Sequence, residues 1–406
     1  MKILFLTISR LTDVSERNIY NDLMRKFRDE GHEVYIVSPR ERRYNEYTTL
    51  TENHGVQILG VRTYNLIKTN IIEKGIGQVL LQRQFIKAID KWLASVKFDL
   101  VLYTTPPITL NGVVKHLKQQ QPTAMSYLML KDIFPQNAVD ISILNKTGIK
   151  GLLFRYFRRK EKELYKVSDY IGCMSPANVK FVVEHNPEVS PDKVEVAPNS
   201  IELGNFKYED DQQKAERYYI RKKYDLPTDK PLFIYGGSLG KPQGICYLIK
   251  CLEANMNRLD CYFVVVGTGT DYNIISDWYK QNKDKNVKLI NYLPKEDYDM
   301  LVKYCDVGLI FLDHRFTIPN FPSRLLSYLE YKMPVICATD PNTDVGRIAE
   351  ENGFGYWCES VKVEDFTNLV DKMLKSDRKV MGEKGYQYLK ENYLVEHTYN
   401  KIMSHF

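Results

Sequence analysis

The stretch IPNFPSRLLSYLEYKMPVI, residues 318–336, has the pattern of a loop, a helix of about three turns and the beginning of a buried strand. Pro322, Ser323 and Arg324 stand at the expected head of the helix. Unpaired backbone N–H groups and the positive end of the dipole attract anions there, and an arginine adds a planar fork of donors. The stretch therefore predicts a diphosphate site. The alternative is that Pro322 and Ser323 only begin the helix and Arg324 is solvated.

Outward from this stretch, the second half alternates strands with helices. It runs PLFIYGG, CYFVVVG, VKLIN, DVGLIFL and PVICA with a helical segment between each pair, and a similar series from KILFLTI to VEVA fills the first half. Residues 203–230 are charged and are expected to connect two domains, with one surface helix. The alternation predicts two doubly wound α/β units in tandem that face a central cleft, with ligands beyond the carboxyl ends of the strands.

Composition agrees with a globular protein of two domains. The chain has 406 residues, of which 44% are hydrophobic and 27% charged. It has no apolar run of ~18 residues, and its amino terminus passes into a helix without a cleavage site, so we expect a cytoplasmic protein without a membrane span. The seven cysteines include no C-x-x-C pair and are expected to be reduced and buried.

The formal charge of +6 is spread unevenly. Residues 1–200 hold 29 Lys and Arg against 21 Asp and Glu, whereas the remainder holds 28 against 30. The basic excess of the first half points to an anionic partner, which is a nucleic acid, a phosphorylated substrate or an acidic membrane surface.

Several nucleotide and metal motifs are absent. The first glycine of the chain is Gly31, so no G-x-G-x-x-G turn follows the first strand, and GGSLGKP at 236–242 has neither the spacing nor the Ser or Thr of a P-loop. H-E-x-x-H and zinc-type Cys/His clusters are also missing. These absences disfavour a nicotinamide enzyme, an ATPase and a dedicated metal site. What remains is a set of glycine-containing loops after the strands of the second half, which let backbone N–H groups approach a ligand closely.

In their order and spacing, GHEVYIVSP, GGSLGKPQGICYLIKCL, VGTGTD, NVKLINYLPKEDYDMLVKYCDVGLIFL and FPSRLLSYLEYKMPVICATD resemble glycosyltransferase family 4. KDIFPQNAVD is similar to a signature of bacterial enzymes that build O-antigen and capsule repeat units. The resemblance implies the GT-B fold, with an acceptor-binding domain over 1–203, a domain binding the nucleotide-sugar donor over 204–385, and a terminal helix over 386–406 that returns toward the first domain. It also implies a retaining hexosyltransferase that uses a UDP-sugar without a cofactor or metal.

The residues that the resemblance assigns are partly substituted in this chain. The arginine and lysine that grip the diphosphate in the family correspond to Ser238 and Gln243, so Lys241 and Arg324 are expected to replace them. The family's ribose-binding glutamate corresponds to Ser327, which leaves Ser327, through water, or Glu330 for the ribose. The predicted set for binding the sugar nucleotide is Gly237, Ser238, Gly267, Gly269, Tyr292, Leu293, Pro322, Ser323, Leu325, Ser327 and Glu330, with Tyr292 and Leu293 at a base that is uracil in the family.

Retaining transfer in this family is attributed to front-face attack, in which the acceptor oxygen approaches on the side from which the diphosphate leaves. Lys241 and Arg324 would offset the charge of the leaving group. Asp132, after the strand AMSYLML, is the candidate for positioning the acceptor or the reacting sugar, and the alternative is that it only caps a turn. The family's histidine is missing here, which leaves the base unassigned. Asp313 and His314 are weaker candidates, whose default interpretation is a polar loop.

Residues 145–169 combine an apolar side with a basic side, as a helix on an anionic membrane does, and residues 70–93 are a second candidate. An ordinary core helix with a solvated face is the alternative for both. Together with the resemblance, this pattern implies transfer of a sugar, an N-acetylhexosamine or a related hexose, from a UDP-sugar to a polyprenyl-diphosphate-linked saccharide of a surface polysaccharide. The enzyme would lie in the cytoplasm, peripheral to the inner face of the plasma membrane, and would bind no nucleic acid. Two alternatives are a GT-B epimerase or phosphorylase, and a non-catalytic basic protein that binds a membrane or nucleic acid.

Overall fold

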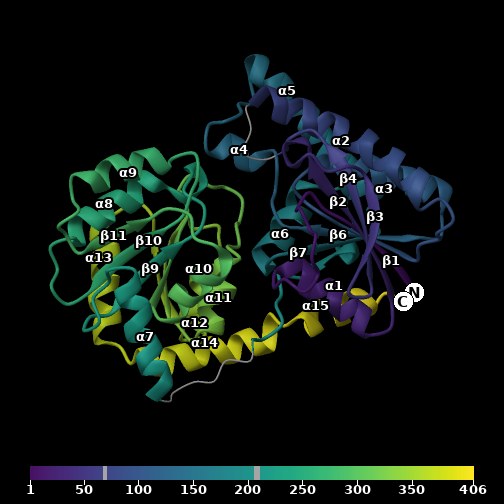
Figure 1. The fold of residues 1–406 in the computed structure, drawn as a ribbon. Helices are drawn as coiled ribbons and strands as arrows, with labels where there is room; N and C mark the ends of the chain where they lie inside the picture. Colours follow the sequence, from purple (N-terminus) through teal and green to yellow (C-terminus); the bar gives the residue numbers. More distant parts are fainter. Residues whose placement is uncertain (67–70, 205–210) are drawn as a thin grey trace. The chain divides into compact units, whose positions relative to one another are not determined.

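The chain divides into two compact α/β units in the computed structural model, which describes residues 1–66, 71–204 and 211–406 (Figure 1). The first unit contains Met1–Glu202 and Leu394–Phe406, and the second contains Leu203–Tyr393. The predicted class, two Rossmann-like units of the GT-B type, is confirmed by the two parallel sheets.

The first unit is built on an eight-stranded sheet in the order β3-β4-β2-β1-β5-β6-β7-β8. All neighbouring strands are parallel except β3 and β4. The strands are β1 (Lys2–Leu6), β2 (Glu33–Glu41), β3 (Thr49–Asn53), β4 (Val56–Thr63), β5 (Leu100–Thr104), β6 (Met125–Leu130), β7 (Tyr170–Cys173) and β8 (Val194–Val196). The helices are α1 (Ile19–Asp29), α2 (Ile71–Trp92), α3 (Asn111–Gln120), α4 (Gln136–Asp140), α5 (Gly148–Val167), α6 (Pro176–His185) and α15 (Val395–Met403).

The second unit has a six-stranded, wholly parallel sheet in the order β11-β10-β9-β12-β13-β14. The strands are β9 (Leu232–Gly236), β10 (Tyr262–Val266), β11 (Val287–Ile290), β12 (Val307–Phe311), β13 (Val335–Thr339) and β14 (Gly355–Glu359). The helices are α7 (Asp211–Lys223), α8 (Ile245–Asn255), α9 (Tyr272–Lys280), α10 (Lys295–Lys303), α11 (Arg324–Glu330), α12 (Val345–Glu351), α13 (Val363–Lys375) and α14 (Arg378–Asn392). The strand order reverses between β9 and β12, which is where such sheets bind ligands.

The central strands of the second unit are buried along their whole length. LFIYG of β9, VGLIF of β12 and VICAT of β13 have no exposed residue, because helices cover both faces of a parallel sheet. Their apolar side chains form one core with α8 and α13. This continuous burial fixes the sheet and leaves the loops at its carboxyl edge to carry the site. Residues 205–210 of the predicted domain connection lie outside the described residues.

The carboxyl-terminal prediction is wrong in one detail, because residues 386–406 are not one returning helix. The helix α14 ends at Asn392 and remains in the second unit, where Gly385 lies against Leu329 of α11. A separate helix, α15, packs on α1 in the first unit, with the ring centres of Tyr399 and Phe27 5.0 Å apart (Figure 1). The break follows from the bridge between Ile201 and Leu394, which draws the chain into an extended conformation.

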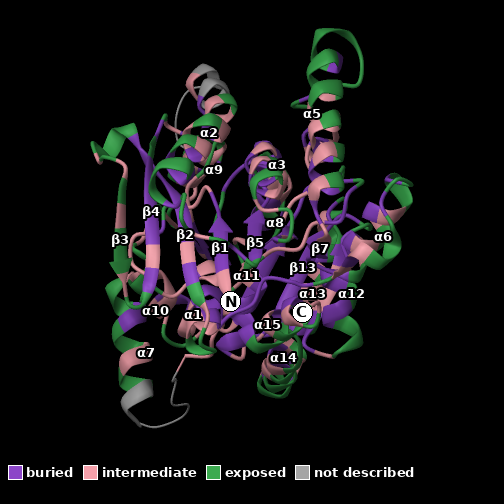
Figure 2. Ribbon diagram, turned by 90° about the vertical axis from the view of Figure 1, so that its right-hand side faces the viewer, coloured by how far each residue is buried: buried purple, intermediate pink, exposed green. Residues whose placement is uncertain are grey.

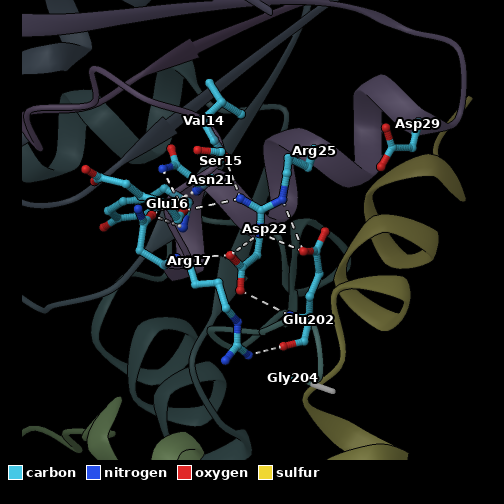
Figure 3. Close-up of polar contacts among 12 residues, drawn as sticks. Val14, Ser15, Glu16, Arg17, Asn21, Asp22, Arg25, Asp29, Glu202 and Gly204 are labelled. Atoms are coloured by element: carbon cyan, nitrogen blue, oxygen red, sulfur yellow. Dashed lines mark hydrogen bonds and ion pairs between the residues drawn. The ribbon is translucent and has the colours of Figure 1, made fainter. Parts of the chain in front are cut away.

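Helix α1 and the loop before it hold Glu202, the last residue of the first segment of this unit, through both its backbone and its side chain (Figure 3). The N–H of Glu202 donates to Asp22, its carbonyl accepts from Arg17, and its carboxylate accepts from Arg25 at 2.6 Å. Arg25 also pairs with Asp22 at 2.7 Å. The end of this segment is therefore fixed by a charged network rather than by apolar packing alone.

Candidate functional site

Loops from three strand ends of the second unit are joined by backbone hydrogen bonds. After β9, the N–H of Gly237 donates to Val266 and the N–H of Leu239 donates to Thr268, both at 2.9 Å. After β12, the N–H of Asp313 donates to the carbonyl of Pro242 at 3.0 Å. The loops that follow β9, β10 and β12 thus form one edge at the point where the strand order reverses.

Two different structural requirements explain why glycine occupies three positions at this edge. Gly237 has φ +130°, which favours glycine, and a Cβ there would lie 3.2 Å from a guanidinium nitrogen of Arg324. Gly267 and Gly269 instead allow two loops to pack, because their Cβ atoms would lie 1.8 Å from the oxygen of Gly237 and 2.1 Å from that of Leu239. The sequence assigned all three to the ligand. The contacts show that Gly267 and Gly269 are needed first for loop packing, and their role toward a ligand stays a prediction.

Arg324 is the principal charged group at this edge. Its guanidinium carbon lies 4.4 Å from the centre of the Tyr235 ring, and its Nη1 is buried with no hydrogen-bond partner. No carboxylate of the described residues forms an ion pair with it, and its other neighbours are the hydroxyl-bearing rings of Tyr298 and Tyr328. A buried positive charge without a counter-ion is costly, and an anionic ligand would supply the missing partner.

The tyrosines that surround Arg324 are not found by the sequence analysis. Tyr298 of α10 covers Gly236, where a Cβ would lie 2.0 Å from its hydroxyl oxygen, and burial raises its pKa to about 12. Tyr328 of α11 accepts a hydrogen bond from the N–H of Gly236. Both therefore remain neutral near pH 7 and offset none of the arginine charge. The only signal in the sequence is Tyr235 beside the glycine pair, which by itself indicates an ordinary buried strand.

The helix head is close to the prediction, but the helix is shorter. Helix α11 begins at Arg324 after Ser323, whose side chain makes no capping hydrogen bond, and has seven residues rather than about three turns. It ends because Lys332 adopts a left-handed conformation, φ +54°, and the N–H of Met333 returns to the carbonyl of Tyr328. The chain is thereby turned into β13.

Asp340, at the end of β13, supports the loop in front of α11. It accepts hydrogen bonds from the N–H and the hydroxyl of Thr343, and that hydroxyl oxygen accepts from the N–H of Asn320 at 2.9 Å. Asn342 donates from its side chain to the carbonyl of Phe316. Burial raises the pKa of Asp340 to about 6 despite these hydrogen bonds. This carboxyl group thus positions the segment that leads to Arg324.

Ser327 and Glu330 lie differently on α11. Ser327 is half-buried, whereas Glu330 is buried and accepts a hydrogen bond from the N–H of Gly204 at 2.8 Å. One carboxylate oxygen of Glu330 is therefore already engaged with the chain. Which of the two binds a ribose stays a prediction.

The remaining predicted residues of the second unit lie in the loops. Lys241 begins the short 3-10 helix η4 (Lys241–Gln243) and is exposed. Ser238 and Tyr292 are exposed, Leu293 and Pro322 are half-buried, and Leu325 is buried. Asp313 forms a two-pronged pair with Arg315, which holds the pKa of Asp313 below its usual value although burial alone would raise it. That ion pair and the exposed position of His314 agree with a polar loop.

Asp132 belongs to the first unit and follows β6. Its carboxylate accepts a hydrogen bond from the side chain of Asn137 at 2.7 Å, and burial raises its pKa to about 6. Asp132 can therefore gain or lose a proton near neutral pH. Its role stays a prediction. In the described parts of the chain, no three His, Cys, Asp or Glu side chains are grouped to hold a metal ion.

The two Rossmann-like units have the fold of the GT-B glycosyltransferases. Residues 216–388, which make up less than half of the chain, match the family described as glycosyl transferases group 1. Among named relatives, WbjE of Pseudomonas aeruginosa, named as a glycosyltransferase, is 20% identical over 80% of this chain and 78% of that protein. WcaI of Escherichia coli K12, named for colanic acid biosynthesis, is 23% identical over 45% of this chain and 43% of that protein.

Solved structures agree on the fold. Sucrose-phosphate synthase of Thermosynechococcus elongatus superposes with a TM-score of 0.75 at 13% identity, over 99% of this chain and 97% of that chain. HepE of Anabaena, solved in complex with UDP-glucose, superposes with a TM-score of 0.68 at 13% identity, over 100% of this chain and 98% of that chain. The match of residues 216–388 and the named relatives confirm the predicted glycosyltransferase, and the solved structures confirm the fold.

Proposed function

We propose that this enzyme transfers a sugar from a UDP-sugar to a lipid-linked saccharide in bacterial surface polysaccharide synthesis, with retention at the anomeric carbon. The acceptor is a polyprenyl-diphosphate-linked saccharide, and the sugar is an N-acetylhexosamine or a related hexose. The name of WcaI, which refers to colanic acid biosynthesis, supports the pathway, and the UDP-glucose bound by HepE supports the class of sugar nucleotide.

The observation that carries this proposal is the guanidinium of Arg324 beside Gly237, whose Nη1 is buried without a hydrogen-bond partner. Breaking the bond between the sugar and the diphosphate leaves a second negative charge on UDP, and preorganised cations stabilise that charge as it develops. Lys241, exposed on the same loop, supplies a mobile ammonium group. This chemistry needs a positive charge within reach, so the two side chains perform it without a metal.

In the first unit, Asp132 would position the acceptor hydroxyl. Its pKa of about 6 leaves it mostly ionised at pH 7, and an ionised carboxylate can accept a hydrogen bond from that hydroxyl. The departing phosphate would then take the proton as the acceptor oxygen attacks from the same face.

Helix α5 supports peripheral contact with an anionic membrane. The beginning of α5 is largely exposed (Figure 2). There Ile149 is 88% exposed and Leu152 61%, which is unusual for aliphatic side chains. Leu153 and Tyr156 are also exposed, and the exposed basic residues of this helix and the turn before it are Lys146, Lys150, Arg155, Arg159, Lys162 and Lys166. The enzyme would therefore dock from the cytoplasm on the inner face of the plasma membrane.

The second membrane candidate, residues 70–93, has fewer exposed apolar side chains where the structure describes them, namely Val79 and Trp92. In α2, the side chains of Leu81, Phe85 and Ile89 are buried in the first unit, as in an ordinary core helix. Residue 70 lies outside the described residues. Among those described, no helix combines the length and apolarity that crossing a membrane requires.

Calorimetric titration with UDP tests the phosphate site. The wild type should bind UDP, Arg324→Ala should bind it at least roughly tenfold more weakly, and Arg347→Ala, an exposed arginine on α12, should bind it normally. Unchanged affinity in Arg324→Ala would show that the phosphate site is wrongly assigned. A screen of UDP-, GDP- and dTDP-sugars by thermal stabilisation then identifies the base and sugar, and the anomeric configuration of the product tests retention.

A further inference from the structure

A second unpaired cation lies in the first unit, at Lys131. Its ammonium nitrogen is buried and makes no hydrogen bond within the protein. Its backbone N–H donates to the hydroxyl oxygen of Thr105 at 3.1 Å, which ties the end of β6 to the end of β5. The preceding residue, Leu130, pairs with Cys173, the last residue of β7. Lys131 thus stands where three parallel strands end, at the edge where open α/β sheets bind ligands.

The groups around Lys131 do not neutralise it. Asp132 directs its carboxylate to Asn137 instead, and Glu161 of α5 pairs with Arg158. Burial raises the pKa of the Cys173 thiol to about 12, so this neighbour stays neutral. Among the described residues, no carboxylate forms an ion pair with Lys131.

This environment disfavours the charged form of the amine. Burial lowers the pKa of Lys131 to about 7, so a substantial fraction is neutral near pH 7 in the free protein. A methionine of similar length would fill the same space without a polar atom to desolvate. The lysine therefore lowers the stability of the fold. We expect such a residue at a ligand-binding edge when a bound ligand needs its positive charge.

We propose that Lys131 binds the diphosphate of the acceptor, with the ammonium group donating to a phosphate oxygen. This inference rests on the proposed function. It adds a side chain of the first unit, Lys131, that recognises the acceptor. The same unit carries the exposed apolar residues of α5, as a prenyl-linked substrate would require. Because the anion stabilises the ammonium form, binding should draw one proton from solution at a pH above the pKa of the free amine.

The experiment uses the full chain saturated with UDP, into which farnesyl diphosphate or inorganic pyrophosphate is titrated calorimetrically. Saturating UDP keeps the second unit from binding either probe at the sugar-nucleotide site. Titration at about pH 8 in two buffers of different ionisation enthalpy gives the number of protons taken up. The variants are Lys131→Met, Lys131→Arg and, as a matched control in the same unit, Lys115→Met, whose side chain is exposed.

The wild type and Lys115→Met should bind farnesyl diphosphate with proton uptake, and Lys131→Met should bind it roughly tenfold or more weakly without uptake. Lys131→Arg should retain binding but take up no proton, since its guanidinium is already charged. Lys131→Met should also have a higher melting temperature than the wild type. If the lysine only stabilised the fold, its replacement would not raise the melting temperature. Preference for farnesyl diphosphate supports a lipid-linked ligand, and equal binding of pyrophosphate supports recognition of the diphosphate alone.

The inference is overturned if Lys131→Met binds both probes as the wild type does, or if the wild type binds neither probe. The preceding UDP titration separates this failure from a failure of the proposed function. If the protein binds UDP but its affinity for the probes does not depend on Lys131, the proposed function stands and only the role of Lys131 toward the acceptor is rejected.

Discussion

The guanidinium carbon of Arg324 lies 4.4 Å from the centre of the Tyr235 ring, and the hydroxyl of Tyr235 donates to the carbonyl of Ser238 at 2.7 Å. One side chain therefore supports both the unpaired cation and the loop that follows β9. The electron-rich ring face stabilises the guanidinium without neutralising it. The positive charge stays available for an anion, and its position is fixed.

Replacing Tyr235 should separate these two effects. Tyr235→Leu removes the ring and should weaken UDP binding by roughly 1–2 kcal/mol, which is about five- to thirtyfold. Tyr235→Phe keeps the ring and loses only the hydrogen bond to Ser238, so its affinity should stay within about threefold of the wild type. Isothermal titration with UDP measures both. Equal affinities in the two variants would show that the ring does not position Arg324.

Loop packing at the strand edge gives a second prediction. In Gly267→Ala the added Cβ would lie 1.8 Å from the oxygen of Gly237, so one loop must move. UDP affinity should fall roughly tenfold or more, and the melting temperature should fall as well, because the two loops share hydrogen bonds. Thr270→Ala, an exposed change in the same loop, is the control and should alter neither quantity. Normal UDP binding by Gly267→Ala would show that the loop contact is not required.

The fold was predictable because burial repeats strongly along the chain. PLFIYGG, DVGLIFL and PVICA are continuous apolar runs between turns, and such runs become the central strands of a parallel sheet, as β9, β12 and β13 do. The place of Arg324 at the beginning of a helix was also predictable, because Pro-Ser after a loop is typical of a helix head. Its role toward a diphosphate stays a prediction.

The surroundings of Arg324 and the burial of the Lys131 ammonium group were not predictable. Tyr298 reaches Gly236 from a helix more than 60 residues away in sequence, and no local pattern encodes that contact. Lys131 stands beside Asp132 in a polar turn, where a lysine is normally solvated, and only the packed strand ends show that its ammonium is buried. Local sequence patterns determine helices and strands, whereas packing between residues far apart in sequence determines which charged side chains become buried.

Asp340 should make stability depend on pH. Its pKa rises from 3.8 to about 6 on folding, so the native state binds the proton more tightly than the unfolded state. The stability that this adds is fully present below about pH 4 and is lost as the pH rises through about 6, a change of roughly 3 kcal/mol at most. Asp340→Asn removes the titration. Urea denaturation between about pH 4 and pH 7 should therefore show the wild type losing stability relative to this variant.

Asp284→Asn is the control for this pH dependence, because Asp284 is exposed. Its difference in free energy of unfolding from the wild type should be nearly constant over the same pH range. A constant difference for Asp340→Asn as well would show that the carboxyl group at the end of β13 titrates normally.

The exposed apolar residues of α5 predict binding to anionic vesicles. Leu152→Glu removes an apolar contact and adds a repelled charge, so the partition coefficient for phosphatidylglycerol vesicles should fall about tenfold or more. Leu259→Glu, at a residue that is 79% exposed in the second unit, is the matched control and should leave partitioning nearly unchanged. Co-sedimentation at low and high salt measures both effects. Equal loss in the two variants, or no binding by the wild type, would contradict docking through α5.

The network around Glu202 predicts a large effect on stability. Arg25 contacts Asp22 at 2.7 Å and Glu202 at 2.6 Å, and Asp22 is buried (Figure 3). Arg25→Met leaves the Asp22 carboxylate buried with fewer partners, so the first unit should lose about 3–5 kcal/mol of stability in urea denaturation. Asp22→Asn in the same chain removes the uncompensated charge and should restore part of the loss. If the double variant is no more stable than Arg25→Met, the loss comes from the packing of the arginine stem rather than from the ion pair.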